Sequence, residues 1–193
     1  MIEILFKHIE QKVNLSPADK EKIATFFVRK RLRKKQYLLH EGDICKYLSF
    51  VATGLTRTYN VDEKGEEHMS VFGWEGWWIS DFNSFLSIEP AVFYIDAIED
   101  SELLIISRSD YDALTDQVPI MDRYFRILFQ NSLVTKERRL MSSITHTAAQ
   151  KYEQLIESNP EIISRIPQNM VASYLGIAPE TLSRIKKGLA YKK

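Results

Sequence analysis

The stretch "QNMVASYLGIAPETLSRIKK", residues 168–187, decides the fold of the C-terminal part of the chain. A helix-turn-helix needs a small residue where its two helices touch, and four positions later a residue free to adopt a left-handed backbone conformation. Ala172 and Gly176 stand at these two places. Apolar residues occupy the five positions that must face the core: Val171, Leu175, Ile177, Leu182 and Ile185. The pattern therefore predicts two short helices joined by a tight turn.

The second of these helices has the side chains expected of a helix that contacts DNA bases. Pro179 suits its first turn, where a missing N–H has no cost. If Leu182 and Ile185 face the core, the outward side carries Pro179, Glu180, Ser183 and Arg184. Arginine suits the O6/N7 edge of guanine, while a carboxylate at Glu180 can accept from cytosine or orient Arg184. We expect phosphate contacts from Gln168, Thr181, Lys186 and Lys187.

A net charge of zero does not argue against DNA binding, because the charges are segregated along the chain. Of the 26 basic and 26 acidic residues, a surplus of acids falls at 41–122 and a surplus of bases at 1–40 and 123–193. Salt screens charges beyond roughly 8–10 Å, so a phosphate backbone responds to the local patch. The basic run "RKRLRKK" (29–35) is interpreted as solvated surface charge.

Composition and motif content exclude several classes of protein. The chain has 193 residues with 45% hydrophobic content, and it lacks an apolar run of the roughly 20 residues that span a bilayer. Its single cysteine, Cys45, cannot form an internal disulfide and suits a reducing cytoplasm. The four histidines lack metal-ligand spacing, and neither a nucleophile–base pair nor a phosphate loop occurs. We expect a cytoplasmic protein that is not an enzyme, contacts no membrane and carries no metal or cofactor.

The pattern of helix-forming and strand-forming segments along the chain predicts an α+β fold in three parts. The segment up to about Arg33 has the pattern of helices, with Ser16 as an N-cap. Between Gln36 and Ser107, five of the seven glycines separate short strands, and "DEKG" marks a hairpin, which is typical of an antiparallel barrel or jelly roll. The rest is helical. The predicted parts are a sensory barrel with N-terminal helices (1–118), a dimerisation helix (119–143) and a helix-turn-helix domain (144–193).

The long helical segment 120–141 admits two interpretations. Met121, Tyr124, Phe125 and Leu128 recur at three- and four-residue spacings, so the helix can pack on its own barrel or also pair with a second copy. One recognition helix contacts only a few base pairs. We therefore expect a homodimer that binds a near-palindromic operator in double-stranded DNA, with half-sites about 34 Å apart.

With these motifs in place, the chain resembles the Crp/Fnr family of bacterial transcription regulators. "YLLHEGDICKYLSFVATGLTRTYNVDEKGEEHMSVF" (37–72) is similar to the barrel pattern of that family, and "LGIAPETLSRI" (175–185) to its recognition segment, with Glu180, Thr181, Ser183 and Arg184 at the matching positions. The resemblance implies a cyclic-nucleotide-binding-like barrel, a dimerisation helix and a winged helix-turn-helix. It further implies that the barrel senses a signal and alters promoter binding.

The barrel departs from members of the family that bind cyclic AMP. Those members hold the phosphate with a Gly-Glu pair and, about ten residues on, an Arg-Ser or Arg-Thr pair. Ser80-Asp81 and Ala91-Val92 stand there instead, and nothing basic lies between Lys64 and Arg108. A phosphate that is buried without a bidentate cation loses its hydration and gains no ion pair in return. We therefore do not expect cyclic AMP as the effector. The remaining alternative is that Arg57 points into the barrel and replaces the missing phosphate-binding arginine.

Aromatic side chains crowd the same region of the sequence. They can form a pocket for an apolar or aromatic effector of unknown identity, or they can fill the barrel and leave no ligand site. For the first alternative, the predicted pocket residues are Trp78, Asp81, Phe82, Ala91, Val92 and Phe93.

The end of the sequence is a second departure from the family pattern. After Gly188 only "LAYKK" follows, which is too short for a two-stranded wing, so we expect a helix-turn-helix that lacks a full wing. Its phosphate contacts are expected from Lys186, Lys187, Lys192 and Lys193. The alternative function is a ligand- or protein-binding module whose helix-turn-helix serves packing or partner contacts.

Overall fold

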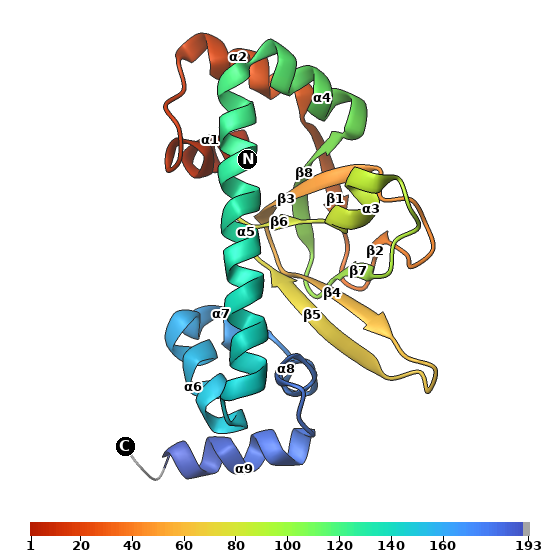
Figure 1. Cartoon of the computed structure of the whole chain (residues 1–193), viewed down its shortest axis with the longest axis vertical. Coiled ribbons are helices and arrows are strands. Elements are labelled where there is room, and N and C mark those ends of the chain that lie inside the picture. The colour runs from red at the N-terminus through yellow and green to blue at the C-terminus, as the bar shows by residue number, and fades with distance from the viewer. Residues whose placement is uncertain (191–193) are drawn as a thin grey trace. The chain divides into compact units, whose positions relative to one another are not determined.

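A computed structural model describes residues 1–190 of the chain, and its fold is the α+β fold that the sequence predicts (Figure 1). Two helices come first, α1 (Ile2–Glu10) and α2 (Pro17–Phe26). The strands are β1 (Val28–Leu32), β2 (Tyr37–Leu39), β3 (Tyr47–Thr53), β4 (Thr56–Val61), β5 (Glu67–Gly73), β6 (Trp78–Ile79), β7 (Tyr94–Ala97) and β8 (Ser101–Ser107), with α3 (Phe82–Ser87) after β6. The helices that follow are α4 (Arg108–Gln117), α5 (Pro119–Thr145), α6 (Ala148–Ser158), α7 (Pro160–Arg165), α8 (Gln168–Leu175) and α9 (Pro179–Ala190).

The chain divides into two compact units, and both are discontinuous in sequence. The first comprises Met1–Asn60 and Phe72–Asn131, and the second comprises Val61–Val71 and the chain from Ser132 onward. The N-terminal half of α5 therefore belongs to the first unit and its C-terminal half to the second. The tip of a barrel hairpin is grouped here with the C-terminal helices, and the parts 1–118, 119–143 and 144–193 stay a prediction.

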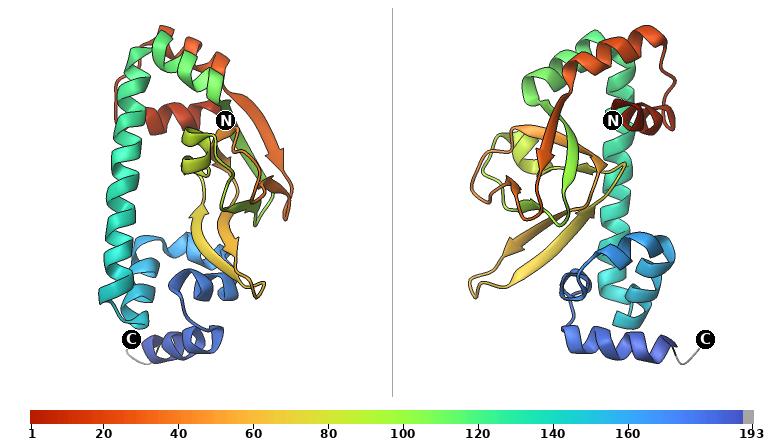
Figure 2. Two further views of the ribbon diagram at one scale, coloured as in Figure 1. Left: turned by 45° about the vertical axis from the view of Figure 1, so that its right-hand side comes forward. Right: turned by 180° about the vertical axis from the view of Figure 1, so that it is seen from behind.

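The sheets form an antiparallel jelly roll, seen from two sides in Figure 2. One sheet has the strand order β1-β8-β3-β6 and the other β2-β7-β4-β5. In the first sheet Phe50 pairs with Leu104, and in the second Thr58 pairs with Ile95. The central strand β3, "YLSFVAT", is buried at five successive residues, so both of its faces are covered.

One predicted element is wrong. The sequence suggested helix up to about Arg33, whereas Val28–Leu32 forms strand β1, which pairs with β8 from Val28↔Ile105 to Leu32↔Ser101. Helix α2 ends at Phe26, because the next residue, Phe27, already has an extended backbone conformation. The basic run 29–35 thus begins on an edge strand, where lysine and arginine side chains discourage pairing with another chain.

The buried hydroxyl of Tyr124 joins three elements in the core of the first unit. Trp78 Nε1 donates to Tyr124 Oη at 2.7 Å, and the Nδ1 atom of His8 lies 2.8 Å from the same oxygen. Met121, Tyr124 and Phe125, from the N-terminal half of α5, are buried here. This arrangement holds α1, β6 and α5 together.

The environment of His8 keeps its imidazole neutral. Burial is the main cause of a pKa lowered from 6.5 to about 4, and the charge of Lys12 adds to it. Lys12 Nζ lies 3.3 Å from His8 Nε2, so a proton on that nitrogen would face an ammonium group.

We expect acid to destabilise the first unit through His8. Because the pKa is about 4 in the folded state and near 6.5 in the unfolded state, the unfolded chain takes up the proton first as the pH falls through this window. The stability conferred by neutral His8 is complete above pH 6.5 and is lost toward pH 4. His8→Asn, which cannot titrate, should flatten this part of the pH profile of urea midpoints. The carboxylates titrate alike in the parent chain and in His8→Asn, so they affect both pH profiles equally. Parallel profiles for the two proteins would therefore contradict the role assigned to His8.

Within residues 1–190, none of the helices combines the length and apolarity needed to cross a bilayer.

Candidate nucleic-acid interface

The turn between α8 and α9 has the geometry that the sequence predicts. Gly176 is the C-cap of α8, with φ 70° and ψ 36°, and its N–H bonds to the carbonyls of Ala172 and Ser173. The N–H of Ile177 also donates to Ala172 O, at 3.0 Å. A Cβ atom at position 176 would meet open space, so glycine is required by the left-handed backbone and not by crowding.

The two helices pack over a small core of their own. Val171, Ala172, Leu175 and Leu182 are buried, as the motif requires, while Ile177 and Ile185 are half-buried. Tyr152 of α6, Ile163 of α7 and Ile166 contribute the other buried side chains of this unit. The position of α9 is therefore fixed by packing at Leu182.

The outward side of α9 is open to solvent. Pro179, Glu180, Ser183 and Arg184 are all exposed. The guanidinium of Arg184 donates to Thr181 Oγ1 at 3.4 Å, so Thr181 holds the arginine from the preceding turn, the role that the sequence had offered to Glu180. These side chains share one accessible face of a helix whose opposite face is buried.

Two of the predicted phosphate contacts lie together. Lys186 Nζ of α9 donates to Gln168 Oε1, at the first residue of α8, at 2.8 Å. Lys187 is exposed on the next position of α9. Lys192 and Lys193, which were expected to replace the wing, lie outside the described residues.

Ser173 anchors α8 to strand β5 within the second unit, a contact that the sequence analysis did not predict. Its hydroxyl donates to Glu67 O at 2.7 Å and accepts from the N–H of Met69 at 3.0 Å. Ser173 lies between Ala172 and Leu175, two core positions of the motif, and the sequence pattern assigned it no role. Only the tertiary structure shows that its side chain inserts into the hydrogen bonding of a strand more than 100 residues earlier.

Arg139 of α5 strengthens the same junction. It donates to Ser70 O and, at 3.5 Å, to Met69 O, and its guanidinium lies 3.9 Å from the ring centroid of Tyr174 in α8. On the sequence it is one of several basic residues in a long helix, without a distinguishing signal. Helix α5, strand β5 and helix α8 are therefore joined by polar contacts next to the recognition helix.

The residues predicted to form an effector pocket have structural partners. Trp78 packs against Phe50 and Phe125, and Phe82 packs edge-on against Phe129. These rings fill the space beside the N-terminal half of α5.

The remaining four of these residues shape the connection between α3 and β7. The buried carboxylate of Asp81 accepts from the N–H groups of Ser84, at 3.1 Å, and Val92, at 3.0 Å. Ala91 is buried, and its N–H donates to Asp43 O. Val92 is exposed and Phe93 is half-buried. An effector pocket at these six residues stays a prediction.

Arg57, the alternative cation for the barrel, forms an ion pair within its own sheet. Its Nε and Nη2 atoms donate to the two carboxylate oxygens of Asp96, each at 2.8 Å, and both side chains are nearly buried. Tyr59 Oη also donates to this carboxylate, at 3.3 Å. The bidentate pair neutralises the arginine within its own sheet.

Comparisons with known proteins agree with this architecture. The family model of the cyclic nucleotide-binding domain matches residues 29–118. The regulatory protein HlyX of Actinobacillus pleuropneumoniae is 21% identical over 81% of this chain and 69% of its own length. The cyclic AMP receptor protein of Thermus thermophilus is 23% identical over 91% of this chain and 83% of its own. The chain is thus similar, over most of its length, to regulators of the Crp/Fnr type. The structure of FixK2 from Bradyrhizobium japonicum shares the fold, with a TM-score of 0.72 and 18% identity over 86% of this chain and 85% of that one.

The match to the cyclic nucleotide-binding domain ends at residue 118, and helix α5 begins at Pro119. Ser173 and Arg139 lie beyond the matched domain, while the strand that they hold, β5, lies inside it. The junction therefore links barrel sequence to helix-turn-helix sequence.

We expect Ser173→Ala to loosen β5. The substitution removes the partner of Met69 N–H and Glu67 C=O, so amide exchange at Met69 should quicken about tenfold, with about 1 kcal/mol lost from the stability of the unit. Hydrogen exchange followed by mass spectrometry measures both. Ser164→Ala is the matched control, because among the described residues the Ser164 hydroxyl donates to Glu161 O, one turn away on its own helix. Unchanged exchange at Met69 in Ser173→Ala would refute an anchoring role.

Proposed function

We propose that this chain is a DNA-binding transcription regulator that contacts the major groove of double-stranded DNA with the outward face of α9. The observation that carries the proposal is the exposed set Pro179, Glu180, Ser183 and Arg184 on a helix fixed by the Gly176 turn and the buried Leu182. An exposed helix face on a rigid support is what base recognition requires.

The side chains of this face divide into base contacts and backbone contacts. Arg184, steadied by Thr181, can donate to guanine, and Glu180 can accept from cytosine. Lys186 and Gln168 are positioned as a pair from two helices, and Lys187 lies beside them. Cations and amides of this kind fix the register of a protein on phosphates without specifying sequence.

Two substitutions distinguish these roles. Arg184→Ala should relax the preference at one base pair and cost about 1–3 kcal/mol on the preferred site, whereas Lys187→Ala should weaken all sequences alike and lower the salt slope by about one. Genomic fragments selected at low salt, followed by titrations at several salt concentrations, measure both effects.

The alternative is a module whose helix-turn-helix serves partner contacts. Failure to retain any duplex fragment at low salt would remove the DNA-binding proposal and favour this alternative. Equal effects of Arg184→Ala on all sequences would remove the assigned base contact alone.

We also propose that two copies pair through the C-terminal half of α5. Five large apolar side chains are exposed there, Leu133, Val134, Leu140, Met141 and Ile144, with exposed fractions from 44% to 71%. Leu133 and Leu140 are seven residues apart, as are Val134 and Met141, which is the repeat that aligns side chains along one side of a helix. A second copy of the chain would cover this stripe.

Leu140→Glu should convert the dimer into a monomer and reduce binding to a near-palindromic site by more than tenfold, because it places a charge in the apolar stripe. Arg138→Gln changes the net charge by the same amount at an exposed position of α5 without altering the apolar surface, and should leave both properties unchanged. Sedimentation equilibrium and DNA titration provide the measurements. A dimer that survives Leu140→Glu would contradict this interface.

Finally, we propose that the barrel does not hold a cyclic nucleotide phosphate. Asp81 is occupied by the N–H groups of Ser84 and Val92, and Arg57 by Asp96. Calorimetric titration with cyclic AMP is expected to show no saturable binding, and saturable binding would contradict the proposal. A signal of other chemistry would act through its unequal affinity for two arrangements of the chain, and the Ser173 junction offers a physical connection between strand and α8.

A further inference from the structure

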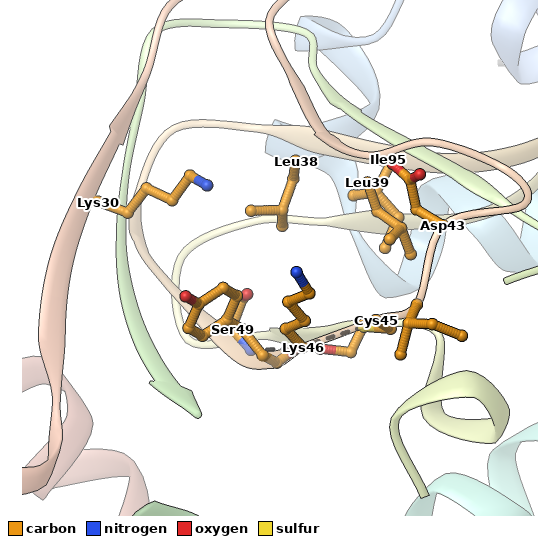
Figure 3. Close-up of a pocket in the computed structure, with 11 residues that line it drawn as sticks. Lys30, Leu38, Leu39, Asp43, Cys45, Lys46, Ser49 and Ile95 are labelled. Carbon is orange, nitrogen blue, oxygen red and sulfur yellow. Dashed lines mark hydrogen bonds between the residues drawn. The ribbon is translucent and has the colours of Figure 1, made fainter. Parts of the chain in front are cut away.

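The first unit contains a cavity that the proposed function does not use. It has a volume of about 370 Å³ and lies between strands β1 and β3 on one side and β2 and β7 on the other (Figure 3). This volume is at the small end of the range of ligand sites. None of the six predicted effector residues lines it.

Two lysines extend toward this space from opposite sides. Lys30 comes from β1 and Lys46 from the segment before β3, and Figure 3 shows both ammonium groups directed toward the cavity. Neither forms an ion pair with another of the described side chains. Asp43 lines the same cavity, so the three charged side chains sum to a single positive charge. One net positive charge favours a monoanion over a phosphate dianion.

A buried hydroxyl at the cavity has an unmet hydrogen bond. Ser49 lines the cavity, the residue is 1% exposed, and its Oγ is the buried side-chain oxygen left without a partner within residues 1–190. An unpartnered buried hydroxyl carries a desolvation penalty that a ligand oxygen would relieve. The neighbouring Cys45 adds no negative charge that would repel an anion, because burial raises the pKa of its thiol and keeps it neutral.

Part of the remaining lining is aliphatic. Leu38 and Leu39 come from β2, Ile95 comes from β7, and Ile44 lies in the segment before β3; Tyr47 and Ser80 also line the cavity. An aliphatic wall accepts hydrocarbon, and a fully hydrophilic ion would leave it in contact with water. A ligand that matches both parts has one negative end and an aliphatic body.

We propose that this cavity binds a small organic monocarboxylate. Lys30 and Lys46 neutralise the carboxylate, the Ser49 hydroxyl donates to it, and Leu38, Leu39 and Ile95 contact its hydrocarbon body. This site goes beyond the proposed function, and its occupancy can be measured in the absence of DNA, so its failure and the failure of DNA binding are separate results.

Octanoate is the probe, followed by calorimetry on the full chain, with octanol and octylamine as neutral and cationic isosteres. Octanoate should bind at least about tenfold more tightly than either isostere. Lys46→Met should weaken octanoate about tenfold, and Lys64→Met, which alters an exposed lysine at the hairpin tip, should have no effect. Equal binding of the three probes, or no octanoate binding, would overturn the proposal.

Ser49→Ala separates ligand binding from folding. Because the hydroxyl has no partner in the protein, its removal should leave stability unchanged or raise it while weakening octanoate about threefold. A less stable variant with unaltered octanoate affinity would show that the hydroxyl serves the fold, and the assigned contact would be wrong.

Discussion

The hydroxyl of Tyr124 sets the constraint on which the first unit depends. It is buried between an indole N–H and an imidazole, so α1, β6 and α5 must meet at one point for both polar partners to be satisfied. The N-terminal half of α5 is thereby committed to the barrel. Its C-terminal half carries apolar residues that its own chain leaves exposed. One helix thus serves as core in one unit and as an open surface in the other.

The helix-turn-helix was predictable because its requirements are local. Ala172, Gly176 and Leu182 act within twenty residues of one another, so their spacing in the sequence is nearly their spacing in space. The barrel was predictable from the spacing of its glycines and from the short strand-forming segments between them. The misassigned segment Val28–Leu32 shows the limit of this reasoning, since only pairing with β8, about 70 residues later, makes a basic stretch adjoining a helix into a strand.

Contacts between residues far apart in the sequence could not be predicted from local sequence patterns. Arg57 and Asp96 are 39 residues apart, and Ser173 and Glu67 are 106 apart, and neither pair has a motif. The cavity was missed for a related reason. Aromatic content suggested where a pocket could form, but those rings pack on α5, and the space that remains depends on how the two sheets stack over Lys30, Ser49 and Ile95. Which side chains fill a barrel is a property of its three-dimensional packing.

The grouping of Val61–Val71 with the C-terminal helices has a consequence for modularity. A segment that starts at Ser132 carries α8 and α9 but lacks the strand that receives the Ser173 hydroxyl and the Arg139 guanidinium. Recombination that exchanged only the C-terminal segment between two regulators would break this junction unless the incoming helices matched the resident hairpin. The hairpin and the helices are therefore expected to be inherited together, although they are separated by 60 residues of barrel and helix.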